Sequence, residues 1–114
     1  KGAGAEKPMK TIEGKIVRDA DRLDAIGAIG IARCFAYGGH KGTPIHLPDV
    51  KPRLHETARE YVSRQGSQIN HFYEKLLLLK DLMLTDGGRK MAEERHNFMK
   101  KYLEQFHLEW DGRI

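Results

Sequence analysis

Three aspartates within six residues are the strongest sign of chemistry in the sequence. Asp19, Asp21 and Asp24 alternate with arginines, and the small-residue segment AIGAIGIAR follows directly. A carboxylate at the edge of an apolar core needs a metal ion or a fixed basic partner, because an unpaired buried charge is costly. On a helix, however, Arg18 can pair with Asp21 and Asp19 with Arg22, which would make a surface ladder of ion pairs. The spacing leaves both interpretations open.

The elements that must position these side chains are all predicted to be helices. Apolar residues recur with helical spacing over 67–84 and over 90–107, and Ser67 is the predicted N-cap of the first of these helices. Two glycines in 85–88 predict a turn, so the two helices should pack antiparallel. The other predicted elements are helices over 11–21, 23–37 and 56–64 and a loop over 40–54. The sequence therefore predicts the all-α class.

Charge and composition exclude several classes of protein. The chain has 114 residues, which suits one domain, and 20 basic against 16 acidic side chains give a net charge of +4. The basic residues are interleaved with acidic ones, unlike the dense stripe of a nucleic-acid groove, but they could attract a small phosphorylated anion. No apolar run approaches the roughly 20 residues of a membrane helix. The single cysteine, Cys34, forms no internal disulfide, which favours a cytoplasmic location.

The histidines give weaker signals. Cys34, His40 and His46 are spaced by six residues and could suggest zinc, but structural zinc sites use four ligands with closer spacing. His107 is predicted at a helix surface, and Trp110 is predicted to cover the end of the core.

His71 and Lys75 lie one helical turn apart and could face a common site. Lys75 would then pair with a substrate phosphate. The alternative is that Lys75 pairs with Glu74 or points into solvent.

Three segments carry a resemblance to a known family. The run DADRLDAIGAIGIAR, residues 19–33, resembles the terminal metal-ligand segment of HD-superfamily metal-dependent phosphohydrolases. The stretches NHFYEKLLLLKDLM, residues 70–83, and RHNFMKKYLEQFHLEWDG, residues 95–112, resemble one bacterial branch of these hydrolases. The resemblance extends over about residues 11–112, which is nearly the whole chain.

The resemblance implies a helical bundle of the HD type and a phosphohydrolase that depends on a divalent metal ion, Mn²⁺ or Mg²⁺. Asp21 matches the final metal-binding aspartate of the family, and no catalytic side chain is assigned. Lys75, Arg22 and Arg33 are the candidates to bind a small phosphorylated substrate such as a nucleotide. The metal would lower the pKa of a bound water and neutralise charge on the phosphoryl oxygens.

The family takes its name from a His…His-Asp pattern that supplies the other metal ligands and precedes this segment. The present sequence contains no His-Asp dipeptide. We therefore expect residues 1–114 to be the C-terminal portion of a single HD-type domain, with the N-terminal half of the same domain as its partner. That half would cover the leucine-rich 67–84 helix and the small-residue surface over 25–32. The alternative is a non-catalytic helical module that binds a protein or an acidic partner.

Overall fold

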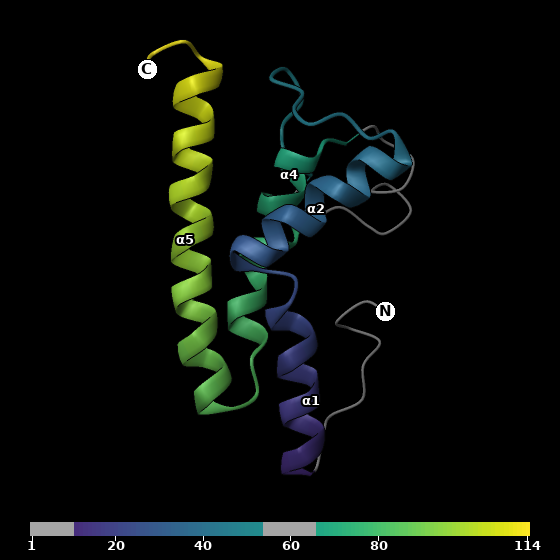
Figure 1. Ribbon diagram of the computed structural model, residues 1–114, viewed down its shortest axis with the longest axis vertical. Helices are drawn as coiled ribbons and strands as arrows, with labels where there is room; N and C mark the ends of the chain where they lie inside the picture. Colours follow the sequence, from purple (N-terminus) through teal and green to yellow (C-terminus); the bar gives the residue numbers. More distant parts are fainter. Residues whose placement is uncertain (1–10, 54–65) are drawn as a thin grey trace.

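The longest helix, α5 (Asp86–Trp110), runs along one side of the molecule, and the other helices pack beside it (Figure 1). The computed structural model describes residues 11–53 and 66–114. The other elements, in chain order, are α1 (Ile12–Leu23), α2 (Gly27–Lys41), α4 (Gln68–Glu74) and the 3₁₀ helix η2 (Leu76–Leu82). Because no strand occurs within these two ranges, the predicted all-α class is confirmed. The helix predicted over 56–64 lies outside the described residues.

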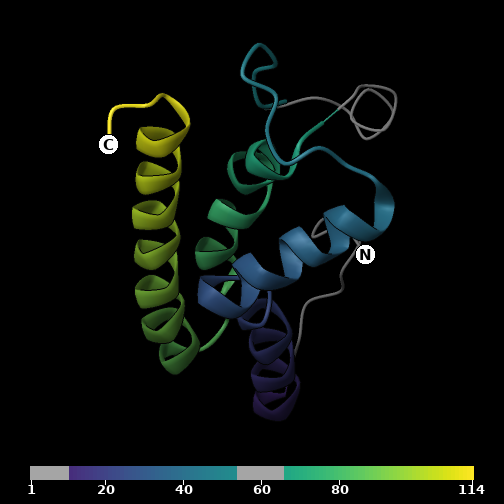
Figure 2. The ribbon, with the colours of Figure 1, turned by 45° about the horizontal axis from the view of Figure 1, so that its top comes forward.

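Helix α5 has contacts with α1, α2 and η2. Figure 2 shows α2 running obliquely to the other helices, while α4 and η2 run beside α5 in the opposite direction. The antiparallel packing expected from the sequence is therefore present. No helix in the described part of the chain is both long enough and apolar enough to cross a membrane.

Three helices of the described ranges begin at a hydroxyl side chain that accepts a hydrogen bond from the backbone. Thr11 Oγ1 accepts from Gly14 N at 3.0 Å. The predicted N-cap Ser67 is confirmed, because its Oγ accepts from Asn70 N at 3.1 Å. Each such bond satisfies one of the N–H groups that a helix leaves unpaired in its first turn.

The turn predicted over 85–88 is wrong. Thr85 caps α5 instead, because its Oγ1 accepts from Gly88 N at 2.9 Å, and the helix begins at Asp86. An N-cap and an acidic residue in the first turn together outweigh the cost of two glycines. Gly88 is also needed there, since a Cβ at this position would lie 2.1 Å from Asp19 Oδ2.

The single helix predicted over 67–84 is interrupted at Lys75. The backbone there leaves the helical region, with φ −136° and ψ −57°, so α4 ends and η2 begins. The leucines of this segment face two different neighbouring helices. Leu76 lines a cavity against α2, whereas Leu77 lines a groove against α5. Part of the cover expected from elsewhere is thus supplied by the described helices themselves.

The path from α1 to α2 depends on Gly27. It begins α2 with φ +72°, a conformation that side chains rarely adopt, and its Cα faces the Arg95 side chain of α5. Helix α2 continues to Lys41 and ends at left-handed Gly42, four residues beyond the predicted end. Helix α5 therefore covers part of the small-residue surface over 25–32. Ala28, Ile29 and Ala32 of this surface are exposed.

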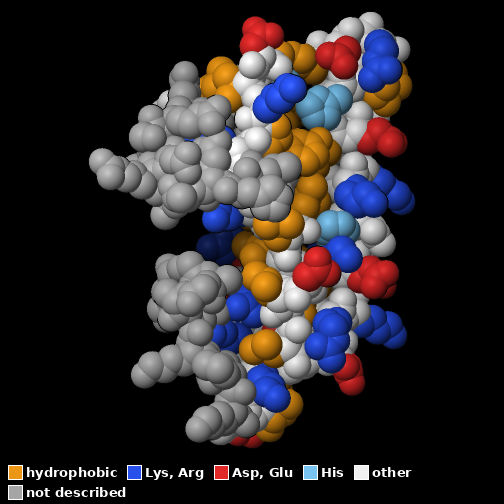
Figure 3. All heavy atoms as spheres, turned by 180° about the vertical axis from the view of Figure 1, so that it is seen from behind, with side chains coloured by type: hydrophobic (Ala, Val, Ile, Leu, Met, Phe, Trp, Pro, Cys, Tyr) orange, Lys and Arg blue, Asp and Glu red, His pale blue; other side chains and the backbone are white. Residues whose placement is uncertain are grey.

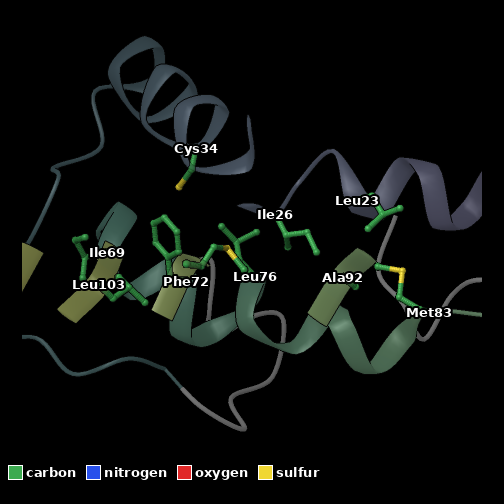
Figure 4. Packing of buried hydrophobic residues seen from close by; sticks show 10 residues of the cluster. Leu23, Ile26, Cys34, Ile69, Phe72, Leu76, Met83, Ala92 and Leu103 are labelled. Carbon is green, nitrogen blue, oxygen red and sulfur yellow. The ribbon is translucent and has the colours of Figure 1, made fainter. Parts of the chain in front are cut away.

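The core lies where α2, α4, η2 and α5 meet (Figure 4). Phe72 is fully buried at its centre, with the rings of Phe35 and Tyr102 at centroid distances of 5.9 and 6.0 Å. Trp110 is the last residue of α5 and does not follow the helix as predicted; its ring is half-exposed and stacks on Phe106, which packs against the core, at a centroid distance of 5.7 Å. The buried apolar cluster comprises Leu23, Ile26, Cys34, Ile69, Phe72, Leu76, Met83, Ala92, Met99 and Leu103.

Candidate functional site

A cavity of about 290 Å³ lies between the end of α1, α2 and α4. Its polar lining consists of Asp21 from α1, Arg33 and Tyr37 from α2, and Gln68 and His71 from α4. We call it the Asp21 cavity. It brings together a carboxylate, a guanidinium, a phenol and an imidazole from three separate helices.

The structure separates the roles of the clustered aspartates. Asp19 is buried and accepts three hydrogen bonds, from Leu84 N at 2.8 Å, Thr85 N at 2.9 Å and Thr85 Oγ1 at 2.6 Å. Asp21 is exposed and forms no hydrogen bond or ion pair with the described part of the chain. The carboxylate at the edge of the core is therefore Asp19, and Asp21 is the one that can accept a ligand.

The surroundings of Asp19 also set its protonation. Burial raises the pKa of Asp19, but the Thr85 hydroxyl, the two backbone N–H groups and nearby Arg22 outweigh it and hold the pKa below its usual value. Asp19 thus stays ionised without a metal ion.

Two predicted substrate-binding residues do not line the Asp21 cavity. Arg22 Nη1 donates to the carbonyl of Leu82 at 2.5 Å and so joins α1 to η2. Lys75 is exposed at the junction of α4 and η2. The third predicted residue, Arg33, does line the cavity, and its side chain is exposed.

His71 is half-buried in the wall of the cavity. Burial lowers the pKa of His71; the charge of Glu74 raises it, while Lys75 and Arg53 lower it further. The lowered pKa favours the neutral form of the ring at pH 7. The Glu74 carboxylate accepts hydrogen bonds of 2.7, 3.0 and 3.2 Å from Arg53, which joins α4 to the end of the segment before it.

Sequence reasoning did not find Tyr37 and Gln68. Tyr37 follows Arg33 by four residues, so both side chains project from one face of α2. Gln68 precedes His71 by three residues in α4, and its Nε2 donates to the Cys34 carbonyl at 2.6 Å. The helical spacing would have indicated both residues once Arg33 and His71 were placed at a site.

The zinc hypothesis is wrong for the part of the chain that is described. Within it, no group of three or more His, Cys, Asp or Glu side chains lies close enough together to hold a metal ion. Burial raises the pKa of Cys34 to about 11, so the thiolate that zinc requires is scarce. His40 is exposed, and His46 packs against α5.

Asp21 fits a divalent cation as one ligand and no more. A hard cation such as Mg²⁺ takes about six oxygen or nitrogen ligands, and carboxylate oxygen is a ligand it prefers. Residues 11–53 and 66–114 offer one open carboxylate at the cavity, so they do not form a complete metal site by themselves.

The chain is similar to known bacterial proteins, although no protein-family model matches it. It is 44% identical over 112 residues to the uncharacterized protein YpgQ of Bacillus subtilis, a match that covers 98% of this chain and 46% of YpgQ. The chain thus spans about half the length of this relative.

Two solved structures show the same arrangement of helices. An HD-superfamily hydrolase from Bacillus thuringiensis is 52% identical with a TM-score of 0.75, covering 89% of this chain and 47% of that one. The structure of Bacillus subtilis YpgQ in complex with ADP is 45% identical with a TM-score of 0.70, covering 87% of this chain and 44% of that one. The all-α fold described above is therefore that of about half of a solved HD-superfamily hydrolase.

Proposed function

We propose that this chain is part of an HD-superfamily phosphohydrolase that uses a divalent metal ion to act on a small phosphorylated substrate such as a nucleotide. The observation that carries the proposal is the Asp21 carboxylate, which is open to a ligand and shares its cavity with Arg33 and His71. The likeness to an HD-superfamily hydrolase supports the reaction class. The ADP bound to YpgQ supports a nucleotide as the substrate class.

Asp21 would be one ligand of the metal ion, Mn²⁺ or Mg²⁺. The other ligands would come from outside the described residues, and we propose an N-terminal half of the same domain as their source. When bound, the metal would supply a water of lowered pKa and neutralise phosphoryl charge.

The residues of this chain would bind and orient the phosphate. The Arg33 guanidinium can donate two parallel hydrogen bonds to phosphate oxygens, and its exposed position lets it reach a substrate that enters the cavity. The Tyr37 hydroxyl, one helical turn away, offers a further donor. His71, held neutral by burial, lines the cavity without adding a second fixed charge beside Arg33.

The test compares Asp21→Ala with Asp24→Ala, both at exposed carboxylates near the end of α1. Phosphate release by the complete protein, with the proposed N-terminal half present, is measured with a panel of nucleotides at saturating Mn²⁺ and at saturating Mg²⁺. Loss of a residue that only supports a metal ligand costs about 10–100-fold, so Asp21→Ala should lower activity by about 100-fold or more. Asp24→Ala should keep activity within about threefold, since its side chain does not line the cavity.

Circular dichroism supplies the control for folding. Both variants should keep their helical content, because neither carboxylate is buried. Near-normal turnover of Asp21→Ala at saturating metal would show that the proposed ligand is wrong.

A further inference from the structure

The segment after α2 is attached to the C-terminal end of α5 through the ring of His46. Its centroid lies 5.5 Å from Phe106, 5.4 Å from His107 and 4.9 Å from Trp110, with interplanar angles of 88°, 75° and 83°. The Tyr73 hydroxyl of α4 lies 3.2 Å from His107 Nε2. We call these five residues the His46 cluster. Figure 3 shows histidine side chains beside a stripe of hydrophobic ones on the face seen from behind.

The residues next to His46 support the start of α4. The carbonyls of Pro44 and Ile45 each accept a hydrogen bond of 3.0 Å, from the N–H groups of the first two residues of α4. A helix leaves such N–H groups without partners of its own. His46 follows Ile45 directly, so the position of its ring constrains these carbonyls. Helix α4 in turn carries Gln68 and His71 of the Asp21 cavity.

A proton on His46 would disturb this packing. His46 Nδ1 is buried and has no hydrogen-bond partner among the described residues, so an N–H at that atom would lack an acceptor. The neighbouring His107 ring adds repulsion once both rings are charged. The ring faces of Phe106 and Trp110 attract a cation and so oppose this disturbance in part.

Among the described residues, the charged and titratable groups around His46 come from two helices and the residue that caps one of them. Helix α5 contributes His107, its C-cap is Asp111, and α4 contributes Tyr73 through its contact with His107. Asp111 favours the charged ring, but its carboxylate also lies 3.7 Å from Arg113. Burial, with the added effect of His107, outweighs Asp111 and lowers the pKa of His46.

We propose that His46 is a pH-sensitive switch: its neutral ring holds the 43–50 segment against α5 and so fixes the start of α4, and its protonated ring leaves the His46 cluster. The switch operates in the pH range where histidines titrate. It would couple proton concentration to the wall of the Asp21 cavity. It goes beyond the proposed hydrolase activity and does not depend on it.

The test follows amide hydrogen exchange of Gln68 and Ile69, the two donors to the 43–50 segment, in the purified protein at pH 7.5 and pH 5.5. After correction for intrinsic exchange rates, protection at both amides should fall by at least about twofold at pH 5.5, because the ring takes up a proton more readily once it has left the cluster. His46→Phe keeps an aromatic ring that cannot take up a proton, so its protection should stay the same. The exposed His40 gives the control, and His40→Phe should behave as the unaltered protein does.

The result overturns the proposal if the protection of the unaltered protein does not change with pH. The proposal also fails if His46→Phe loses protection to the same extent. Should His46→Phe not fold, the titration of the His46 ring by nuclear magnetic resonance in the unaltered protein decides. A pKa below 6.5 supports the switch, and a pKa above it overturns the proposal.

Discussion

Asp19→Ala tests how firmly α1 is joined to the start of α5. The carboxylate is 2% exposed and accepts hydrogen bonds from Leu84 N, Thr85 N and Thr85 Oγ1. Hydrogen bonds to a charged group contribute about 1.5–3 kcal/mol each, but water can reach part of the junction in the variant because Leu84 is exposed. We therefore expect the free energy of unfolding to fall by about 3–5 kcal/mol, a large part of a typical domain's stability.

Urea denaturation followed by far-UV circular dichroism measures the loss. Asp24→Ala is the matched control, because it removes an exposed carboxylate from the same end of α1, and it should cost less than about 1 kcal/mol. Asp19→Asn should fall between the two, since the amide keeps one acceptor oxygen but loses the charge. If Asp19→Ala costs no more than Asp24→Ala, the three hydrogen bonds do not stabilise the fold as argued.

The same interaction predicts a dependence on pH. Because the pKa of Asp19 in the folded protein lies below its ordinary value of 3.8, its contribution to stability is present above about pH 4. The contribution is lost as the pH falls through the folded-state pKa. The stability difference between the unaltered protein and Asp19→Asn should therefore shrink in acid, and a difference that stays constant down to pH 2 would contradict this account.

Two further predictions concern small residues near this junction and in the core. Gly88→Ala should lower the free energy of unfolding by about 1–3 kcal/mol, because the new Cβ would lie 2.1 Å from Asp19 Oδ2. At Gly87 a new Cβ would meet nothing within 4 Å, so Gly87→Ala should raise the free energy of unfolding by about 0.5–1 kcal/mol. Equal thermal denaturation midpoints for the two variants would contradict this. The Cys34 thiol, buried and with its pKa raised to about 11, should react with a thiol reagent at pH 8 at least about 100-fold more slowly than in urea, and comparable rates would show that it is accessible.

Features that depend on local sequence could be predicted, and features that depend on distant contacts could not. The cap at Ser67 and the all-helical class follow from neighbouring residues alone. The start of α5 at Asp86 depends on Asp19, which receives hydrogen bonds from residues 65 and 66 positions further along the chain. The break at Lys75 likewise depends on packing against two different helices, which a helical pattern of leucines does not reveal.

The candidate site was predictable in part for the same reason. Asp21 and Arg33 line one cavity, and their roles as metal ligand and phosphate ligand stay predictions. Arg22 follows Asp21 directly, yet it donates to the backbone of η2 and does not line the cavity. Tyr37 comes from the same helix as Arg33 and was missed because a lone tyrosine carries no signal until its neighbour is placed.

The two aspartates at the end of α1 show why spacing alone could not assign their roles. Residues two positions apart lie about 200° around a helix, so Asp19 and Asp21 must face nearly opposite directions. One direction leads to the start of α5, where backbone N–H groups and a threonine hydroxyl satisfy Asp19. The other leads to the Asp21 cavity, where no described donor satisfies Asp21. A single turn of helix thus fixes the fold with one carboxylate and leaves the other open for a ligand, and the mutational effects of the two should separate into stability and activity.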